Sequence, residues 1–564
     1  MIRSALEQLA PVRRLRDALV DPLPRQLARL ARLGLDTGFP WQFLRHPLAA
    51  LSVARARGLN AAMLHALHAS NHPHRAALVD GTRTVSYARA DQEINAFAHA
   101  LRGPLGLQRG EAVALVLENR AEYLLAWFAA MRAGVRVLHA GSHLTADELL
   151  HMLRTGHARA VVASQATAPM VRVALAAAGL ARGHLVVCDG TPEAGERSWG
   201  SLLEGARVDF PEAPKERAES VVFTSGTTGK PKGAARDFVA FGPLELARVL
   251  ERLPFSCAER HLVVAPLSHS APQVFALLQT ALGSTLYLEP RFEPERTLRA
   301  LSRERAHSVF LVPTMLRRVL DLPAATQRAW PTPELRAVVV GSSVFDEGLR
   351  AEAIARFGAH AVFDFYGATE LGWVTLIRGD EMRSHPGSVG RPLPGQQVRI
   401  LDATGGPSPA GETGLIGVRN AQSMLGYTGD AQATKDTVRA GWTTVEDTGW
   451  LDEDGYLYLA GRARDLVKSG GVNVYPAEVE RVLALDPQVR EVCVIGVPDR
   501  EWGERVTAVV VPSGPHFDAE LARARAKEKL SPAKVPRAWH VVEALPRNVN
   551  GKVLRTELRA RFSR

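Results

Sequence analysis

Cysteine is scarce in this chain: its 564 residues hold three, Cys188, Cys257 and Cys493. They are too widely separated for a disulfide framework or a zinc site, so we expect a reducing compartment and no structural zinc. No apolar run reaches the ~18 residues that a transmembrane helix needs, and acids and prolines interrupt anything resembling a signal peptide. These absences predict a globular, cytoplasmic protein.

Lysine is missing from the first 60 residues, which hold ten arginines and four acids and carry +6 of the formal net charge of +10. With leucines at helical spacing, this segment has two interpretations. It is either a peripheral contact with an anionic membrane, or an amphipathic helix pair that packs on the main body with its arginines in water. The basic charge belongs to one end of the chain, and we expect no nucleic-acid partner.

The ordinary P-loop pattern is absent from the most informative segment, residues 224–233, because Lys230 is followed by proline. This segment, TSGTTGKPKG, follows the apolar run Val221-Val222-Phe223. Glycines allow a close approach of backbone N–H groups to an anion, hydroxyls donate to phosphoryl oxygens, and lysines supply positive charge. The pattern predicts a strand that leads into a nucleotide-phosphate loop; the competing interpretation is a solvated linker.

Between residues 75 and 365, apolar β-type runs alternate with helical patterns, which predicts parallel sheets covered by helices. Residues 386–460 are typical of a small antiparallel barrel or sheet, and the pattern after 461 is α+β. The expected fold is a large α/β domain with a smaller mobile α+β domain. The boundaries are a basic segment 1–60, a large domain 61–461, a hinge 462–465 and a small domain 466–564.

Three further clusters carry groups that suit nucleotide chemistry. Residues 364–370, DFYGATE, offer an aromatic ring for a purine, a threonine for phosphate and a glutamate for Mg²⁺. Residues 446–450, EDTGW, offer a carboxylate for a ribose diol, with Arg462 further on. Residues 546–552 present Lys552 beyond a flexible turn. Taken singly, each cluster has an alternative interpretation: the first is equally typical of a surface loop, the second of a turn-rich hairpin and the third of a solvated surface lysine.

In this order, the four clusters resemble the adenylate-forming superfamily of acyl-CoA synthetases, nonribosomal adenylation domains and luciferases, over residues 60–560. The resemblance implies that the 224–233 loop binds ATP phosphates, that Thr369 and Glu370 serve phosphate and Mg²⁺ together with Thr228, and that Lys552 contacts the carboxylate and α-phosphate. The residues that would line the ATP phosphates are Thr224, Ser225, Gly226, Thr227, Thr228 and Lys232. Those that would lie near adenine are Gly341, Ser342, Asp364, Tyr366 and Gly367. The ribose hydroxyls would be held by Asp447 and Arg462.

The same resemblance implies a second half-reaction, in which the small domain turns and presents a glycine-rich face to a thiol. Residues 468–476, with Lys468, Gly470 and Gly471, match that face, where glycines leave room for a pantetheine arm. A tight turn before the helix expected at Pro476 is the alternative. The family usually has Asp or Lys two residues after the hinge arginine, whereas this chain has Arg464, so the pivot residue stays open.

Residues 266–269, PLSH, resemble the element whose histidine lies near the acyl carboxylate, although Ser268 replaces the usual aromatic. His269 is equally interpretable as a packed residue at a helix start. No acidic residue is placed to bind a substrate amine, which favours an acyl chain over an amino acid. We therefore expect a medium- or long-chain fatty acyl-CoA synthetase that uses ATP, Mg²⁺ and coenzyme A. The alternatives are an acyl-AMP ligase that loads a carrier protein, or a non-catalytic nucleotide-binding or membrane-scaffolding paralogue.

Overall fold

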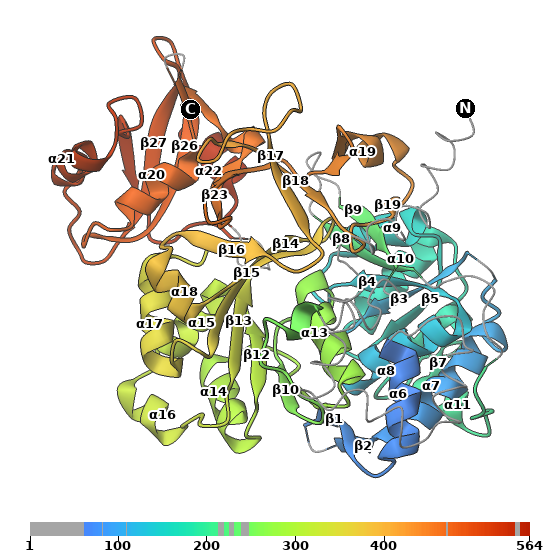
Figure 1. Cartoon of the computed structure of the whole chain (residues 1–564). Coiled ribbons are helices and arrows are strands. Elements are labelled where there is room, and N and C mark those ends of the chain that lie inside the picture. Colours follow the sequence, from blue (N-terminus) through green and yellow to red (C-terminus); the bar gives the residue numbers. More distant parts are fainter. Residues whose placement is uncertain are drawn as a thin grey trace.

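The computed structural model describes residues 61–81, 83–108, 110–211, 219–224, 231–237, 248–469, 472–547 and 553–563. Two large mixed sheets lie side by side in the N-terminal part, and a smaller sheet forms the C-terminal part (Figure 1). The expected large α/β domain with a smaller α+β domain is confirmed. In the described part of the chain, no helix is both long and apolar enough to cross a membrane.

The first sheet has the strand order β19-β9-β8-β4-β3-β5-β6-β7. Strands β8 to β7 in this order run parallel, β9 is antiparallel to β8, and β19 is antiparallel to β9. The strands are β3 Ala112–Val116, β4 Arg136–Ala140, β5 Ala158–Ala163, β6 Leu185–Val187, β7 Arg197–Ser198, β8 Ser220–Thr224, β9 Lys232–Arg236 and β19 Gly426–Tyr427. The helices of this half are α6 Ala61–Asn71, α7 Tyr87–Arg102, α8 Ala121–Ala133, α9 Ala146–Thr155, α10 Ala168–Ala178 and α11 Trp199–Leu203, with the 3-10 turn η1 Arg182–His184.

The second sheet begins with the order β2-β1-β11-β10-β12-β13-β14-β15, in which β1 to β14 run parallel and β2 and β15 are antiparallel. Its strands are β1 Ala76–Asp80, β2 Arg83–Ser86, β10 Arg260–Val263, β11 Thr285–Leu288, β12 Ser308–Leu311, β13 Ala337–Gly341, β14 Val362–Ala368 and β15 Gly372–Arg378. The helices are α13 Ser270–Ala281, α14 Pro294–Arg303, α15 Pro313–Leu320, α16 Ala324–Ala329, α17 Glu347–Phe357 and α18 Gly379–Ser384. The predicted alternation of strands and helices is confirmed, because fully buried parallel strands leave continuous apolar runs.

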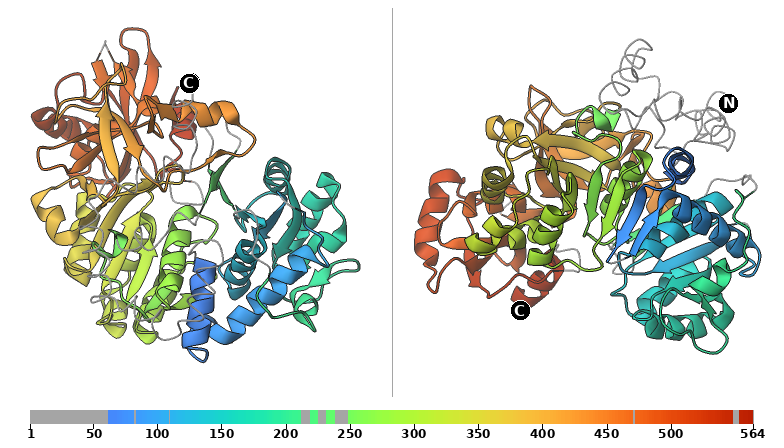
Figure 2. Two further views of the ribbon diagram at one scale, coloured as in Figure 1. Left: turned by 45° about the vertical axis from the view of Figure 1, so that its right-hand side comes forward. Right: turned by 90° about the horizontal axis from the view of Figure 1, so that it is seen from below.

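The antiparallel segment expected at 386–460 is continuous with the second sheet, because β15 pairs with β16. It contains β16 Ser388–Pro392, β17 Gln397–Leu401, β18 Gly414–Arg419, α19 Ala431–Asp436, β20 Val438–Arg439, β21 Trp442–Thr443, β22 Asp447–Leu451 and β23 Leu457–Arg462. The small domain follows the turn η3 Ala463–Asp465, with β24 Val467–Ser469, β25 Val472–Val474, α20 Pro476–Leu483, β26 Val489–Asp499, β27 Gly503–Pro512, α21 Ala519–Lys529, β28 Ala538–Val541 and α22 Arg555–Phe562. Figure 2 shows this domain above the edge of the second sheet.

One hydrophobic core spans both halves of the large domain. Trp127 and Phe128 on α8 and Phe275 on α13 are at most 1% exposed and belong to the same cluster of buried side chains. Phe275 stacks on Phe310 and packs beside Trp373, so the helix between the two halves also supports the strands that reach the site. The shared core makes the two halves one packed body.

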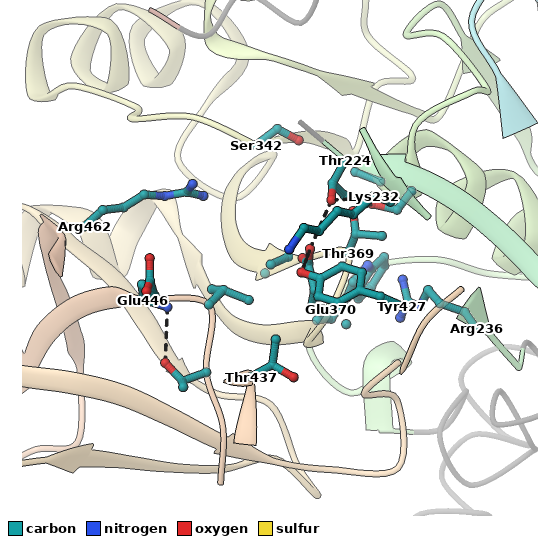
Figure 3. A pocket seen from close by; sticks show the side chains of 18 of the residues that line it. Thr224, Lys232, Arg236, Ser342, Thr369, Glu370, Tyr427, Thr437, Glu446 and Arg462 are labelled. Carbon is teal, nitrogen blue, oxygen red and sulfur yellow. Dashed lines mark hydrogen bonds between the residues drawn. The ribbon is translucent and has the colours of Figure 1, made fainter. Parts of the chain in front are cut away.

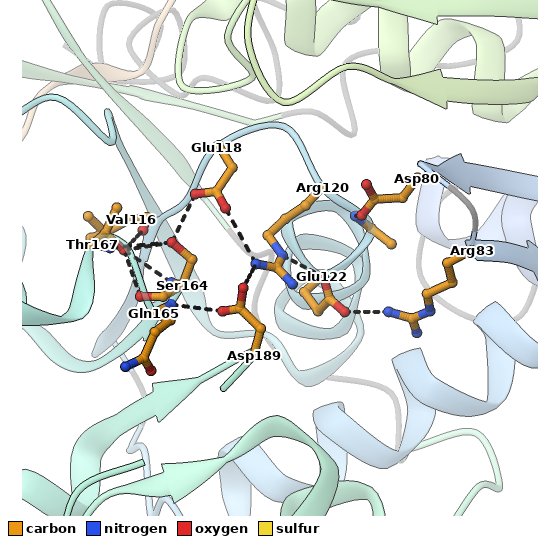
Figure 4. Close-up of polar contacts among 11 residues, drawn as sticks. Asp80, Arg83, Val116, Glu118, Arg120, Glu122, Ser164, Gln165, Thr167 and Asp189 are labelled. Carbon is orange, nitrogen blue, oxygen red and sulfur yellow. Dashed lines mark hydrogen bonds and ion pairs between the residues drawn. The ribbon is translucent and has the colours of Figure 1, made fainter. Parts of the chain in front are cut away.

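A polar network reinforces the same junction at the carboxyl end of β3 (Figure 4). Arg120 donates from Nε to Glu122 at 2.7 Å and pairs through Nη1 with Asp189, which follows β6, at 2.9 Å. Glu122 is 3% exposed and is also paired with Arg83 of β2. Asp80 at the end of β1 accepts from the N–H of Ala121 at 3.0 Å. The network therefore joins loops of both sheets around the start of α8.

Replacing Arg120 by methionine should lower the free energy of unfolding by about 2 kcal/mol, because Glu122 stays buried with one cation fewer. Urea denaturation measures this loss. The matched control is Arg159→Met, whose ion pair with Glu111 is more than half exposed on the arginine side and should change stability by less than about 1 kcal/mol. Equal losses in the two variants would contradict a special role for the Arg120 network.

Candidate active site

A cavity of about 380 Å³ opens where β8, β9 and β14 end. Figure 3 shows its side chains converging from both sheets and from the antiparallel segment. Its walls divide into three parts. The first wall carries hydroxyls, Lys232 and Glu370. The second leads to Arg462 at the end of β23. The third is mainly apolar and holds Ala271 and Trp373.

Glu370 lies at the centre of the first wall and is 8% exposed. Its Oε1 accepts hydrogen bonds from Tyr427 Oη at 2.8 Å and from Thr224 Oγ1 at 3.3 Å. Burial, together with the neighbouring Glu370 carboxylate, raises the pKa of Tyr427, so its hydroxyl remains a donor at neutral pH. Two hydroxyls thus orient one carboxylate between the end of β8 and the cavity.

Lys232 begins β9 beside this carboxylate. Its Nζ lies 3.5 Å from Asp430 and 5.5 Å from the centre of the Tyr427 ring. Strand β19 brings Tyr427 here by pairing it with Ala234 of β9. From the second sheet, Thr369 follows the last residue of β14, and its hydroxyl is 3.0 Å from Ser270 Oγ. The first wall therefore combines hydroxyl donors with an ammonium, as phosphate binding requires.

The second wall is organised around Asp447. Its carboxylate accepts from Tyr366 Oη at 2.9 Å and from Arg462 Nε at 3.1 Å, so the predicted ribose ligands lie together. Burial and the Asp447 charge raise the pKa of Tyr366. Glu446 precedes Asp447, has a left-handed φ of 63° and lines the cavity. Its carbonyl accepts from the N–H of Ala463 in the turn η3 at 2.7 Å.

Two glycines on β13 and β14 are required by close packing. A Cβ at Gly341 would lie 2.5 Å from the ring of Phe365, and a Cβ at Gly367 would lie 2.3 Å from the carbonyl oxygen of Gly372. Ser342 follows Gly341 with a φ of 72° and lines the cavity. Both glycines are therefore set by packing within the protein, and a side chain at either would displace a strand end that borders the cavity.

Asp364, expected near adenine, does not line the cavity in the described structure. It is 3% exposed and accepts from Arg350 Nη2 at 2.6 Å. Burial raises the pKa of Asp364 to about 6, although Arg350 opposes the shift. This buried pair supports strand β14 from behind. Tyr366 is 7% exposed and likewise contributes through its bond to Asp447 rather than as a wall of the cavity.

His269 is the residue before α13 and is not part of the cavity lining, whereas the next residue, Ser270, is. Lys468 lies on β24 of the small domain, with its N–H bonded to Glu504, and it too is outside the lining. Several predicted residues lie outside the described part of the chain, so their places stay predictions: Ser225, Gly226, Thr227, Thr228, Gly470, Gly471 and Lys552.

Sequence reasoning missed Tyr427 and Arg236. Arg236 had a signal, since it is four residues after Lys232 and a strand places alternate residues on one face. No sequence pattern near Tyr427 indicated its role, because it reaches Glu370 only through the pairing of β19 with a strand almost two hundred residues earlier.

The donor set fits Mg²⁺ held mainly by nucleotide phosphates. Glu370 supplies one carboxylate beside hydroxyl oxygens, and Mg²⁺ in nucleotide enzymes typically takes one or two carboxylates and keeps several other oxygen ligands. No group of three or more His, Cys, Asp or Glu that could hold a metal occurs among the residues with described positions.

Comparisons with known proteins agree with this geometry. The chain is 34% identical over 497 residues to feruloyl-CoA synthase of Amycolatopsis sp, covering 87% of this chain and 96% of that protein. It is 29% identical over 507 residues to the fatty acid–[acyl-carrier-protein] ligase ScoC of Streptomyces coeruleorubidus, covering 88% and 95%. The structure matches the amide bond synthetase McbA of Marinactinospora thermotolerans with a TM-score of 0.80 at 28% identity, covering 89% and 100%.

The fold and site together define an adenylate-forming enzyme, an AMP-forming acid–thiol ligase with a large α/β domain and a smaller C-terminal domain. Residues 66–428 match the AMP-binding enzyme family and residues 478–552 match the AMP-binding enzyme C-terminal domain. The chain belongs to the AMP-binding enzyme family. ATP and coenzyme A as co-substrates are consistent with that membership.

Proposed function

We propose that the chain is a fatty acyl-CoA synthetase acting on medium- or long-chain carboxylic acids. The observation that carries the substrate class is the third wall of the cavity, where Ala271, Val274, Phe365 and Trp373 lie beside Glu370. Apolar side chains favour an aliphatic chain, and an unpaired ammonium would cost several kcal/mol to bury there. Similarity to a fatty acid ligase supports the same class.

In the first half-reaction, the acid's carboxylate attacks the α-phosphorus of ATP, and pyrophosphate leaves to give an acyl-adenylate. Thr224 and Lys232 are placed to bind phosphate oxygens, and Asp447 with Arg462 to hold the ribose hydroxyls. Glu370, together with Thr228, would hold Mg²⁺, which when bound neutralises phosphate charge. Lys552 would offset the repulsion between the two anions as they approach.

In the second half-reaction, the thiol of coenzyme A attacks the acyl carbonyl, and AMP leaves. We propose that the small domain turns at 462–465 and brings Lys468, Gly470 and Gly471 to the acceptor side. Ala463 is hydrogen-bonded to Glu446 of the large domain, while Asp465 lies 3.8 Å from Arg555 of the small domain. Arg464 therefore lies between a residue bonded to the large domain and a residue paired within the small domain, which favours Arg464 as the pivot.

Two parts of the proposal concern partners. A carrier protein is the alternative acceptor, as the similarity to ScoC suggests; comparing rates with coenzyme A and with a carrier protein separates the two. Peripheral contact with an anionic membrane would involve residues 1–60, which lie outside the described residues. A cytoplasmic location stays a prediction.

The acid specificity is tested with a series of acids from acetate to long-chain acids, beside aryl and amino acids. Each buried CH₂ should improve kcat/KM by about fourfold, the equivalent of ~0.8 kcal/mol, until the cavity ends and the gain stops. Acid-dependent pyrophosphate release measures this. A maximum at acetate, at an aryl acid such as ferulate or at an amino acid would overturn the fatty-acid assignment and leave the adenylation chemistry intact.

A further inference from the structure

Glu446 is an acidic residue on the nucleotide side of the cavity. It lies just before β22 and lines the cavity, whereas the next residue, Asp447, does not. Figure 3 shows Glu446 on the same side of the cavity as Arg462, with Lys232 on the other side. Because the phosphates are expected at the Lys232 side, the uncharged part of a nucleotide reaches Glu446.

The backbone of Glu446 is held in a conformation that suits glycine better than glutamate. Its φ of 63° lies in the left-handed region, which is unfavourable for a residue with a Cβ. Its N–H donates to Thr444 Oγ1 at 3.2 Å, and its carbonyl accepts from the N–H of Ala463 at 2.7 Å. Strained backbone of this kind is concentrated at functional sites. The backbone therefore gives no reason for a glutamate here, and the reason is sought in the side chain.

The carboxylate of Glu446 is available to a ligand. Among the residues that the structure describes, none forms a hydrogen bond or an ion pair with it. Both carboxylate oxygens of Asp447, in contrast, are engaged, Oδ2 with Tyr366 Oη and Oδ1 with Arg462 Nε. A carboxylate accepts hydrogen bonds and a guanidinium donates them, whereas a hydroxyl does both. The pair of Glu446 and Arg462 therefore suits the vicinal hydroxyls of a ribose.

We propose that Glu446 is a specificity-determining residue that accepts a hydrogen bond from a ribose hydroxyl of ATP, beside the proposed ribose ligands Asp447 and Arg462. This inference rests on the proposed use of ATP at this site and is independent of which acid is activated. A hydroxyl that donates to a carboxylate forms a charge-assisted hydrogen bond, which is stronger than one between neutral groups. A nucleotide that lacks this hydroxyl leaves the carboxylate without its partner, so ATP is selected over that deoxy analogue.

The test measures the dissociation constants of the magnesium complexes of ATP, 2′-deoxy-ATP and 3′-deoxy-ATP by calorimetry, without any acid. In the wild-type enzyme, ATP should bind about tenfold or more tightly than one of the two analogues. Glu446→Gly, in which glycine adopts the left-handed φ freely, should lower that ratio about tenfold, a difference of ~1.4 kcal/mol, by weakening ATP binding and not the binding of that analogue. Glu446→Gln, whose amide oxygen still accepts, should retain part of the ratio.

The matched control is Ala440→Gly. Ala440 also has a left-handed φ, of 49°, and is not among the residues that line the cavity. The substitution relieves the same kind of backbone strain but removes no carboxylate. All three dissociation constants should therefore keep their wild-type values.

Unchanged ratios in both Glu446 variants overturn the proposal, because they show that no ribose hydroxyl depends on this side chain. Tighter ATP binding by Glu446→Gly also overturns it, since the carboxylate would then repel the phosphates. A loss of discrimination between ATP and inosine triphosphate alone would place Glu446 at the base and refute the ribose assignment. If Glu446→Gly does not fold, Glu446→Gln decides. Absence of ATP binding by the wild-type enzyme overturns both the inference and the proposed adenylation, whereas failure of fatty acids as substrates affects the proposed function alone.

Discussion

Replacing Lys552 by alanine should slow acyl-adenylate formation about a thousandfold and leave much of the thioester step intact. The reason is electrostatic: an anionic carboxylate must approach an anionic phosphorus, and a cation stationed there counts most as charge develops. In the proposed cycle this lysine is at the carboxylate only during adenylation. Single-turnover assays, with ATP and acid or with preformed acyl-adenylate and coenzyme A, measure the two steps separately.

A lysine on the same domain provides the control. Lys529 ends α21, is exposed, and should give wild-type rates in both half-reactions when changed to alanine. Equal loss of both half-reactions in Lys552→Ala would contradict the assigned role, as would retention of the adenylation rate.

Replacing Glu370 by glutamine should lower kcat/KM by about a hundredfold to a thousandfold, because the shape is kept while the carboxylate charge is lost. Tyr427 and Thr224 both donate to this carboxylate, and they orient it toward the phosphate wall. The concentration of Mg²⁺ that gives half-maximal rate should rise as well. Steady-state kinetics across a magnesium titration measure both effects.

Tyr427→Phe isolates the orienting bond from the charge. It removes one hydrogen bond to Glu370, which is worth about 1.5–3 kcal/mol when the acceptor is charged, so the loss should be smaller than that of Glu370→Gln. A Glu370→Gln enzyme with normal magnesium dependence would show that this carboxylate does not serve the metal.

The sequence predicted the strands of both parallel sheets because buried parallel strands leave continuous apolar runs. The run Ala337–Val340 became β13, and Leu262–Ala265 corresponds to β10 shifted by two residues. The joining of the antiparallel segment to the second sheet through β15 and β16 was not predictable, because hydrophobic alternation specifies a face of a strand but no partner.

Some residues of the site could likewise be predicted from the sequence, and others could not. Glu370, Lys232 and Arg462 could be predicted because the residues that give each its chemistry are close in sequence, and the structure brings all three to one cavity. Tyr427 reaches the cavity through the pairing of β19 with β9, which no local pattern records, whereas Arg236 shares a strand face with Lys232 and could have been predicted from that spacing. Asp364 lies in the predicted motif, yet its side chain is bonded to Arg350 while its neighbour Phe365 lines the cavity, since successive residues of β14 face opposite sides.

The most direct measurement of the central claim is the product balance with MgATP, a medium-chain acid and coenzyme A. The account predicts one AMP and one pyrophosphate for each acyl-CoA formed, with pyrophosphate release that requires the acid and thioester formation that requires coenzyme A. Formation of ADP and phosphate, or of AMP without any dependence on an acid, would contradict it.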